Sequence, residues 1–256
     1  MRIRGLLAGL VAAAFASATA HAHDFFLLPD KFSNAAAGPI GVQASVGSSF
    51  PTPEIVVTAD RVDRLFAEGA GSPRLTVVGA GAKALNLRLA GANRGTVAIA
   101  VKAKDRDVDY AEDRIPLILE EYRISPEAVA AVNRLTKPRT LKVLSRRFAK
   151  TLVCVQACGN RAAAARPLGA DLEFVATGPG LDHFRLLNRG QPLGRYPVDL
   201  VYQNGKRLHL TTDARGEVHL PAASEGSLML FAAVMTPPTS GERFTLDLST
   251  LTFSRP

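Results

Sequence analysis

Apolar residues recur in short alternating runs along most of the chain, and turn-forming residues separate these runs. Alternation with a period of two is typical of strands that bury one face. Glycine, proline, asparagine or aspartate bounds most of the runs. The pattern predicts strands at residues 40–46, 55–58, 75–78, 84–89, 96–101 and 149–155, and a second set at 172–176, 196–202, 206–211, 217–220, 227–235 and 244–253.

The apolar period changes at about residues 113–137, where the pattern favours helix. Ser125 can cap a helix whose first position is Pro126, and both residue types are preferred at those positions. Apolar residues then recur at helical spacing up to Leu135, and Pro138 ends the segment. We interpret this segment as a short helical insertion in an otherwise all-β chain.

The two sets of strands predict two immunoglobulin-like β-sandwich domains. The N-terminal sandwich covers residues 23–162 and carries the helical insertion, and the C-terminal sandwich covers residues 168–256. Asn204-Gly205 is a strong two-residue hairpin signal. Asp213–Gly216 fits a type I turn closed by a left-handed glycine. Both turns are expected to join neighbouring antiparallel strands.

The first 22 residues predict a cleaved signal peptide. Arg2 and Arg4 precede an apolar stretch at residues 5–16, and cleavage after Ala20 or Ala22 fits the A-x-A pattern. The stretch is shorter than the roughly 20 residues that a membrane-spanning helix needs. We therefore expect a periplasmic or secreted protein with no transmembrane segment in the mature chain.

The positive charge of the chain is dispersed along the sequence. The formal net charge is +8, and removing Arg2 and Arg4 leaves +6 by subtraction. Lys102 and Lys104 are followed at once by three aspartates at positions 105, 107 and 109. A nucleic-acid interface needs a dense basic stripe with stacking aromatic residues, so we expect no nucleic-acid partner.

Cys154 and Cys158 are the only cysteines of the chain. In an oxidising compartment two cysteines this close are first interpreted as a disulfide. On a straight strand both would point to one face, so the bridge requires a bend at Gln156-Ala157. Free thiols or a metal role remain alternatives.

Histidines supply the candidate metal ligands, and two of them lie at the predicted cleavage point. Cleavage after Ala20 leaves a mature start of His21-Ala22-His23. Its amine, two backbone amides and the His23 imidazole form a square-planar nitrogen set that suits Cu(II) or Ni(II). Cleavage after Ala22 exposes His23 with its own amine, which needs a further ligand from the fold.

Two further histidines flank the second predicted turn. If residues 206–211 and 217–220 pair as a hairpin, His209 and His219 lie diagonally on its exposed face. The alternative is an ordinary solvated polar face. His183, beside Asp182, is expected in a surface loop.

Recognised catalytic motifs give no support for an enzyme. Residues 75–84 match a strand followed by G-x-G-x-x-A, but the dinucleotide site needs a helix after these glycines, and Leu85, Leu87 and Leu89 alternate like a strand. Hairpin glycines are the expected interpretation. We found no nucleophile elbow, zinc-protease helix or phosphate loop. A copper-dependent oxygenase that uses His23 is the enzymatic alternative.

Several segments together resemble an uncharacterised family of exported proteins often labelled nickel-uptake, substrate-specific components. The segments that carry this resemblance are residues 21–29, 46–51, 120–124, 145–153, 211–216 and 249–253. The resemblance implies two β-sandwich modules, export and transition-metal handling. His21 and His23 match the family. The family usually has tryptophan where Phe26 stands and histidine where Val234 stands.

These observations predict an exported, non-catalytic binding protein for Ni(II), Co(II) or Cu(II). His21 and His23 are its first candidate ligands, and delivery to a membrane metal transporter is the implied role. A metal-free adhesion or interaction module is the alternative.

Overall fold

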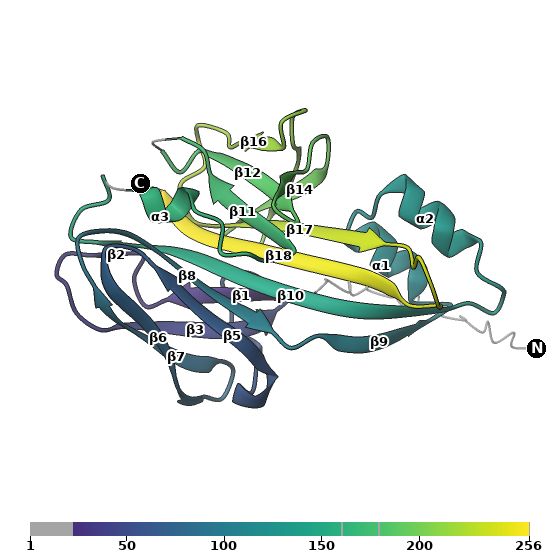
Figure 1. Cartoon of the computed structure of the whole chain (residues 1–256), viewed down its shortest axis with the longest axis horizontal. Coiled ribbons are helices and arrows are strands. Elements are labelled where there is room, and N and C mark those ends of the chain that lie inside the picture. Colours follow the sequence, from purple (N-terminus) through teal and green to yellow (C-terminus); the bar gives the residue numbers. More distant parts are fainter. Residues whose placement is uncertain (1–22, 160, 179, 256) are drawn as a thin grey trace, which may run out of the picture.

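The strands form three sheets in the computed structural model, which describes residues 23–159, 161–178 and 180–255 (Figure 1). Sheet A has the order β1 (Asp24–Pro29), β3 (Ile40–Gly47), β7 (Leu85–Ala92) and β6 (Gly71–Ala80), with β4 (Ile55–Val56) beside β3. Sheet C contains β11 (Leu172–Ala176), β12 (His183–Asn188) and β13 (Gln191–Pro192), and β16 (Glu217–His219) pairs with β12.

Sheet B is the largest of the three and runs through the middle of the molecule. Its strand order is β15 (Arg207–Thr211), β14 (Pro197–Tyr202), β17 (Gly226–Thr236), β18 (Phe244–Arg255), β10 (Thr140–Val155), β8 (Gly95–Ala103) and β5 (Val62–Glu68). The strands β2 (Ser33–Asn34) and β9 (Arg106–Ala111) also pair with β10. The helical elements are η1 (Ala59–Arg61), α1 (Ile115–Glu121), α2 (Pro126–Asn133) and α3 (Ala162–Ala165).

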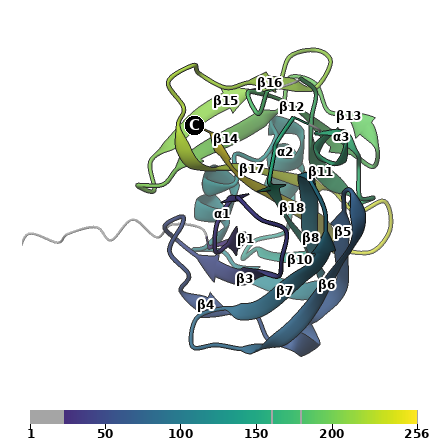
Figure 2. The same cartoon turned by 90° about the vertical axis from the view of Figure 1, so that its left-hand side faces the viewer.

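Sheets A and C cover different parts of sheet B, which gives two β-sandwiches (Figure 2). One core packs sheet A against β8 and the end of β10, and includes Leu27, Leu87 and Ile99. Another packs sheet C against β14, β17 and β18, and includes Phe184 and Phe253, whose ring centroids are 4.8 Å apart. The predicted all-β sandwich fold is confirmed.

One long strand, β10, belongs to both sandwiches. Val143–Thr151 pairs in parallel with Phe244–Thr252 of β18. Leu152–Val155 then pairs antiparallel with Gly95–Ala98 of β8. The predicted boundary between residues 162 and 168 therefore falls after this strand, while sheet B is continuous across the two units.

The predicted helical insertion is confirmed as α1 and α2, which lie at one end of sheet B (Figure 1). The Ser125 hydroxyl accepts a hydrogen bond from the Ala128 amide at 3.4 Å, and Pro126 occupies the first turn. The buried faces of both helices pack with Leu141, Phe231 and Leu246 into a separate apolar cluster. The apolar residues whose spacing predicted helix thus form the face that packs against the sheet.

The glycine-rich segment that matches the dinucleotide fingerprint is a β-hairpin. Strands β6 and β7 pair antiparallel on either side of it, and the Gly81 amide donates to the Ala84 carbonyl at 2.8 Å. No helix follows these glycines among the described residues up to α1. The interpretation as hairpin glycines is confirmed.

The hairpin predicted at Asp213–Gly216 is wrong, although the turn itself forms. Gly216 has φ +76°, and Oδ1 of Asp213 accepts from the Arg215 and Glu217 amides at 2.8 Å each. The chain changes sheets at Thr212, whose hydroxyl donates to the Leu193 carbonyl at 2.8 Å. As a result, β15 pairs with β14 in sheet B and β16 pairs with β12 in sheet C. The hairpin at Asn204-Gly205 is confirmed by the pairing of β14 with β15.

The sulfurs of Cys154 and Cys158 are joined in the structure, with Cα atoms 5.2 Å apart. Gln156 has φ +60°, which supplies the bend at the end of β10. Because the closed loop is short, reduction is expected to lower the free energy of unfolding by only about 2 kcal/mol on the chain-entropy model. Urea unfolding with and without reductant, compared with a Cys154→Ser/Cys158→Ser double variant, measures this effect. A variant that loses several times that amount would contradict it.

None of the helices in the described part of the chain is long and apolar enough to cross a membrane.

Candidate functional site

His23 is the first residue that the structure describes, and it begins the approach to β1. Its side chain is 49% exposed, and its Nε2 atom lies 3.9 Å from Oε2 of Glu54. Its carbonyl accepts a hydrogen bond from Nη1 of Arg147 at 3.3 Å. The imidazole is therefore accessible, while the backbone beside it is held by β10. The predicted signal peptide, both cleavage sites and His21 lie outside the described residues.

Glu54 is held in place by Ser48, which lies in the segment 46–51 that carries the family resemblance. The Ser48 hydroxyl donates to Oε1 of Glu54 at 2.8 Å, and the Ser48 amide donates to Oε2 at 3.1 Å. These side-chain and backbone hydrogen bonds hold the pKa of Glu54 below its usual value. The carboxylate is thus charged and oriented beside His23, as a metal ligand or a support for a ligating histidine requires.

A groove of about 390 Å³ extends from His23 along the N-terminal sandwich. Apolar side chains of Phe25, Val46 and Ile55 form part of its wall. The groove also has four cationic side chains, from Arg61, Lys104, Arg106 and Arg147. It is therefore electropositive, which suits anionic or neutral ligands better than a bare cation.

A charged network lies next to this groove and joins the two sandwiches. Arg207 of β15 donates to Asp24 of β1 and, at 3.2 Å, to Asp199 of β14. Asp199 also accepts from Arg123 at 2.9 Å and contacts Nδ1 of His209 at 2.8 Å. Burial raises the pKa of Asp24 to about 6. Within the described part of the chain, Oδ1 of Asp24 is buried without a hydrogen-bond partner.

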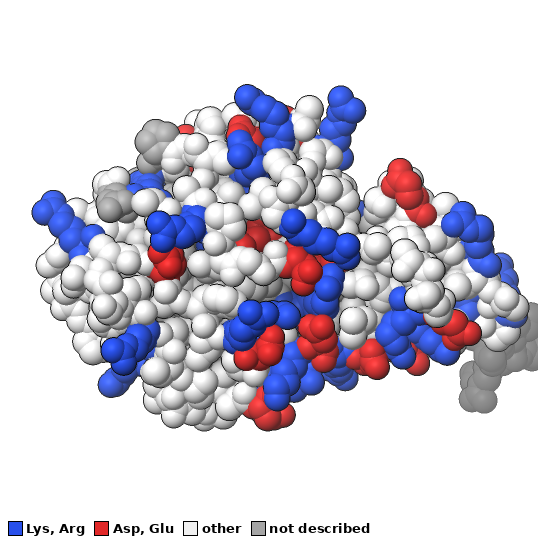
Figure 3. Space-filling model, in the orientation of Figure 1, with Lys and Arg blue, Asp and Glu red and all other residues white. Residues whose placement is uncertain are grey.

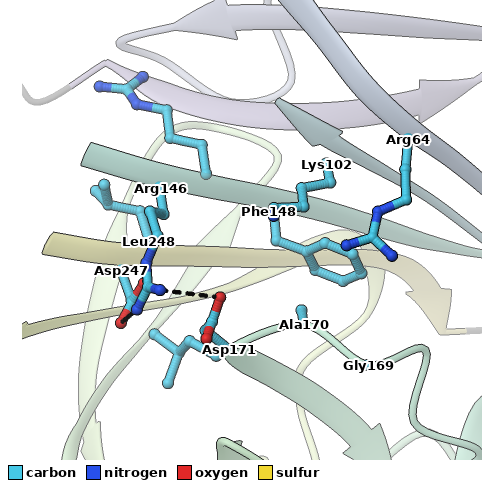
Figure 4. A pocket seen from close by; sticks show the side chains of 11 residues that line it. Arg64, Lys102, Arg146, Phe148, Gly169, Ala170, Asp171, Asp247 and Leu248 are labelled. Carbon is cyan, nitrogen blue, oxygen red and sulfur yellow. Dashed lines mark hydrogen bonds and ion pairs between the residues drawn. The ribbon is translucent and has the colours of Figure 1, made fainter. Parts of the chain in front are cut away.

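A second pocket of about 250 Å³ lies between the sandwiches, where β5, β8, β10 and β18 face residues 169–172 (Figure 4). Arg146 binds Asp247 through two hydrogen bonds of 2.6 and 2.7 Å, and its Nη1 lies 3.3 Å from Asp171. Lys102 lies 3.4 Å from Asp63. Because carboxylates pair with these cations, the pocket is a poorer anion site than its cationic lining suggests.

Opposite charges also alternate over the surface in Figure 3, where blue and red side chains form a mixed band across the middle of the molecule. The face shown carries no unbroken basic stripe, in keeping with the dispersed charge of the sequence.

The other predicted histidines do not form the pair expected from the sequence. His209 is on β15 and contacts Asp199, with its side chain 63% exposed. His219 is on β16, directly opposite His183 of β12, and the two ring centroids are 4.1 Å apart. His183 is a surface residue as predicted, with its side chain 42% exposed. It begins a strand and does not lie in a loop, because Phe184 and Leu186 alternate into the core.

Val234, where the family usually has histidine, lies on β17 and is 8% exposed in the core of the C-terminal sandwich. It supplies no polar ligand. Sequence reasoning also missed Glu54 and Asp24. Asp24 could have been noticed, since it is a charged residue next to the apolar run at 25–28. Glu54 gave no local signal.

The fold and these sites describe a β-sandwich protein with an accessible histidine at the start of its first strand. The chain belongs to the family DUF4198, a domain of unknown function, whose model matches residues 20–236. No curated protein matches the chain. Among solved structures, the D0-D1 domain of Intimin is similar over 90% of this chain and 97% of that one, with 14% identity and a TM-score of 0.24.

Proposed function

We propose that this protein is an exported, non-catalytic binding protein that holds Ni(II), Co(II) or Cu(II) at its processed N-terminus. The observation that carries the proposal is the exposed His23 imidazole beside the oriented Glu54 carboxylate. The sequence His21-Ala22-His23 adds the amine and backbone nitrogens of the chelate. Delivery of the ion to a membrane metal transporter is part of the proposal.

The cations of the groove are compatible with such a chelate. A divalent ion bound through two deprotonated backbone amides carries no net charge, so nearby arginines do not repel the complex. Positive charge also favours the deprotonated form of an ionisable group. Arg147, which donates to the His23 carbonyl at 3.3 Å, is one such cation. Glu54 provides an additional oxygen for an ion that needs more than the planar set.

Metal titration of the mature chain beginning at His21 tests the proposal. We expect equimolar binding of Cu(II) or Ni(II) by calorimetry, with the visible absorption of a square-planar complex. The matched control adds one alanine before His21, which moves the imidazole out of the third position but leaves every native residue in place. This control and His23→Ala should both lose the square-planar spectrum.

Other outcomes would contradict parts of the proposal. If the mature chain binds none of Ni(II), Co(II) and Cu(II), the metal-binding proposal is refuted and the metal-free interaction module is favoured. Unchanged binding by the alanine-extended chain would refute the N-terminal chelate. The alternative has one specific observation in its favour: β6 is the last strand of sheet A, and its Val78 is 62% exposed. An exposed apolar strand edge can pair with another chain.

A further inference from the structure

Two histidines face each other across neighbouring strands of sheet C. In the antiparallel pairing of β12 with β16, His183 is directly opposite His219. Their ring centroids are 4.1 Å apart, with an angle of 53° between the ring planes. Side chains at directly opposed positions of two strands point to the same face. Both imidazoles therefore lie close enough together to bind one ion after small rotations of their side chains.

Carboxylates surround this histidine pair. Ligand atoms of Asp213, Glu217 and His219 lie within 4.8 Å of one another, and they form the only set of three potential metal-ligand side chains found in the described ranges. On the other side, Oδ2 of Asp182 lies 3.5 Å from Nε2 of His183. Three carboxylates, from Asp182, Asp213 and Glu217, therefore lie around the two imidazoles, with the guanidinium groups of Arg185 and Arg215 beside them.

The existing partners of these carboxylates indicate which oxygens are available. Oδ1 of Asp213 closes its turn by accepting two backbone amides, whereas Oδ2 lies 3.5 Å from Nε of Arg215. Glu217 binds Arg185 through Oε1, whereas Oε2 lies 3.7 Å from Arg215. The Arg215 side chain is 75% exposed, so it can move into solvent. Oε2 of Glu217 and Oδ2 of Asp213 are thus the carboxylate oxygens that an ion can take most easily.

We propose that Asp213, Glu217 and His219, together with His183 opposite His219, form a second metal site for a borderline divalent ion such as Zn(II), Ni(II) or Cu(II). Imidazole nitrogen suits all three ions, and a carboxylate oxygen completes a common zinc ligand set. Asp182 supports the His183 ring, as carboxylates do for metal-binding histidines. The site uses none of the N-terminal ligands, so it does not depend on the function proposed above.

An ion at this site would join two strands that have a short contact. Strand β16 has three residues, and its pairing with β12 covers only positions 183–185 and 217–219. Because a ligand that binds only the folded state stabilises it, zinc is expected to raise the melting temperature of the protein. It should also slow amide exchange in β16.

Zinc titration of the mature chain in a His21→Ala/His23→Ala background tests this site separately from the N-terminal one. We expect equimolar zinc binding in the background protein and a higher melting temperature with zinc. His183→Ala and His219→Ala should each weaken binding by at least the roughly 10–100-fold that losing a support of a ligating histidine costs. His209→Ala is the matched control, because His209 is an exposed strand histidine that contacts Asp199 instead.

Three results would overturn the site: no zinc binding in the background protein, unchanged affinity in either His183→Ala or His219→Ala, or an equal loss in His209→Ala. Melting curves without zinc show whether each variant is folded. Should an alanine variant melt early, His183→Gln and His219→Gln replace it, since glutamine keeps a polar side chain but lacks the imidazole. A failure of N-terminal nickel or copper binding would leave these zinc results unaffected.

Discussion

Replacing Lys150 with methionine is expected to lower the free energy of unfolding by about 3–5 kcal/mol, the usual effect of removing one partner of a buried ion pair. Lys150 and Glu173 are each 1% exposed, and Nζ lies 2.7 Å from Oε1 of Glu173. The ammonium also donates to the carbonyls of Arg166 and Phe174, at 3.3 and 3.2 Å. Without it, a buried carboxylate loses its counter-charge and two carbonyls lose a donor.

Urea unfolding of Lys150→Met measures this effect. Lys142→Met is the matched control, because the Lys142–Glu242 pair has the same 2.7 Å separation but lies at the surface. Exposed pairs contribute little to stability, so this control should unfold almost as the native protein does. Equal losses in the two variants would show that burial is not what makes the Lys150 pair important.

The free energy of unfolding of the native protein is expected to fall as the pH rises from about 4 to 6. Asp24→Asn should remove this pH dependence. Desolvation by burial is the largest cause of the raised Asp24 pKa, from 3.8 to about 6, and Arg207 opposes it. In this pH range the unfolded chain releases the proton before the folded protein does. Folded protein then binds more protons than unfolded protein, so its free energy of unfolding falls as pH rises.

The size of this effect follows from the shift in pKa. One pKa unit corresponds to 1.36 kcal/mol, so the loss attributable to Asp24 should approach about 3 kcal/mol by pH 7, where the folded carboxyl has also ionised. The measurement is the difference in unfolding free energy between native protein and Asp24→Asn at pH 4, 5, 6 and 7. Asp105→Asn, at an exposed position, controls for the change of residue type. A difference that is constant with pH would contradict the shifted pKa.

Local sequence patterns predicted those parts of the fold that local interactions determine. Asn204-Gly205 produced the expected hairpin, and Ser125-Pro126 began the expected helix. The Asp213–Gly216 turn also formed, but the strands on its two sides entered different sheets. That outcome depends on contacts of Thr212 with Leu193 and Tyr196, which are distant in sequence and leave no local signal.

The same distinction between local signals and contacts distant in sequence applies to the candidate sites. The sequence indicated His23 and His219 as potential ligands, but it paired His219 with His209 because the two flank one turn. The observed partner, His183, is 36 residues away and is brought opposite His219 by the pairing of β12 with β16. Glu54 reaches His23 only because β3 and β4 carry it beside the start of β1. Such pairs depend on sheet topology, which residue spacing does not reveal.

Strand β18 lies inside sheet B, between β17 and β10, and pairs with both along most of its length. Residues 244–255 follow all the other described strands in the sequence. Until they are in place, β10 and β17 each have an unpaired inner edge, and the contact between the two sandwiches is incomplete. Hairpins such as β14–β15 are local and can form early, but sheet B closes only when β18 is inserted.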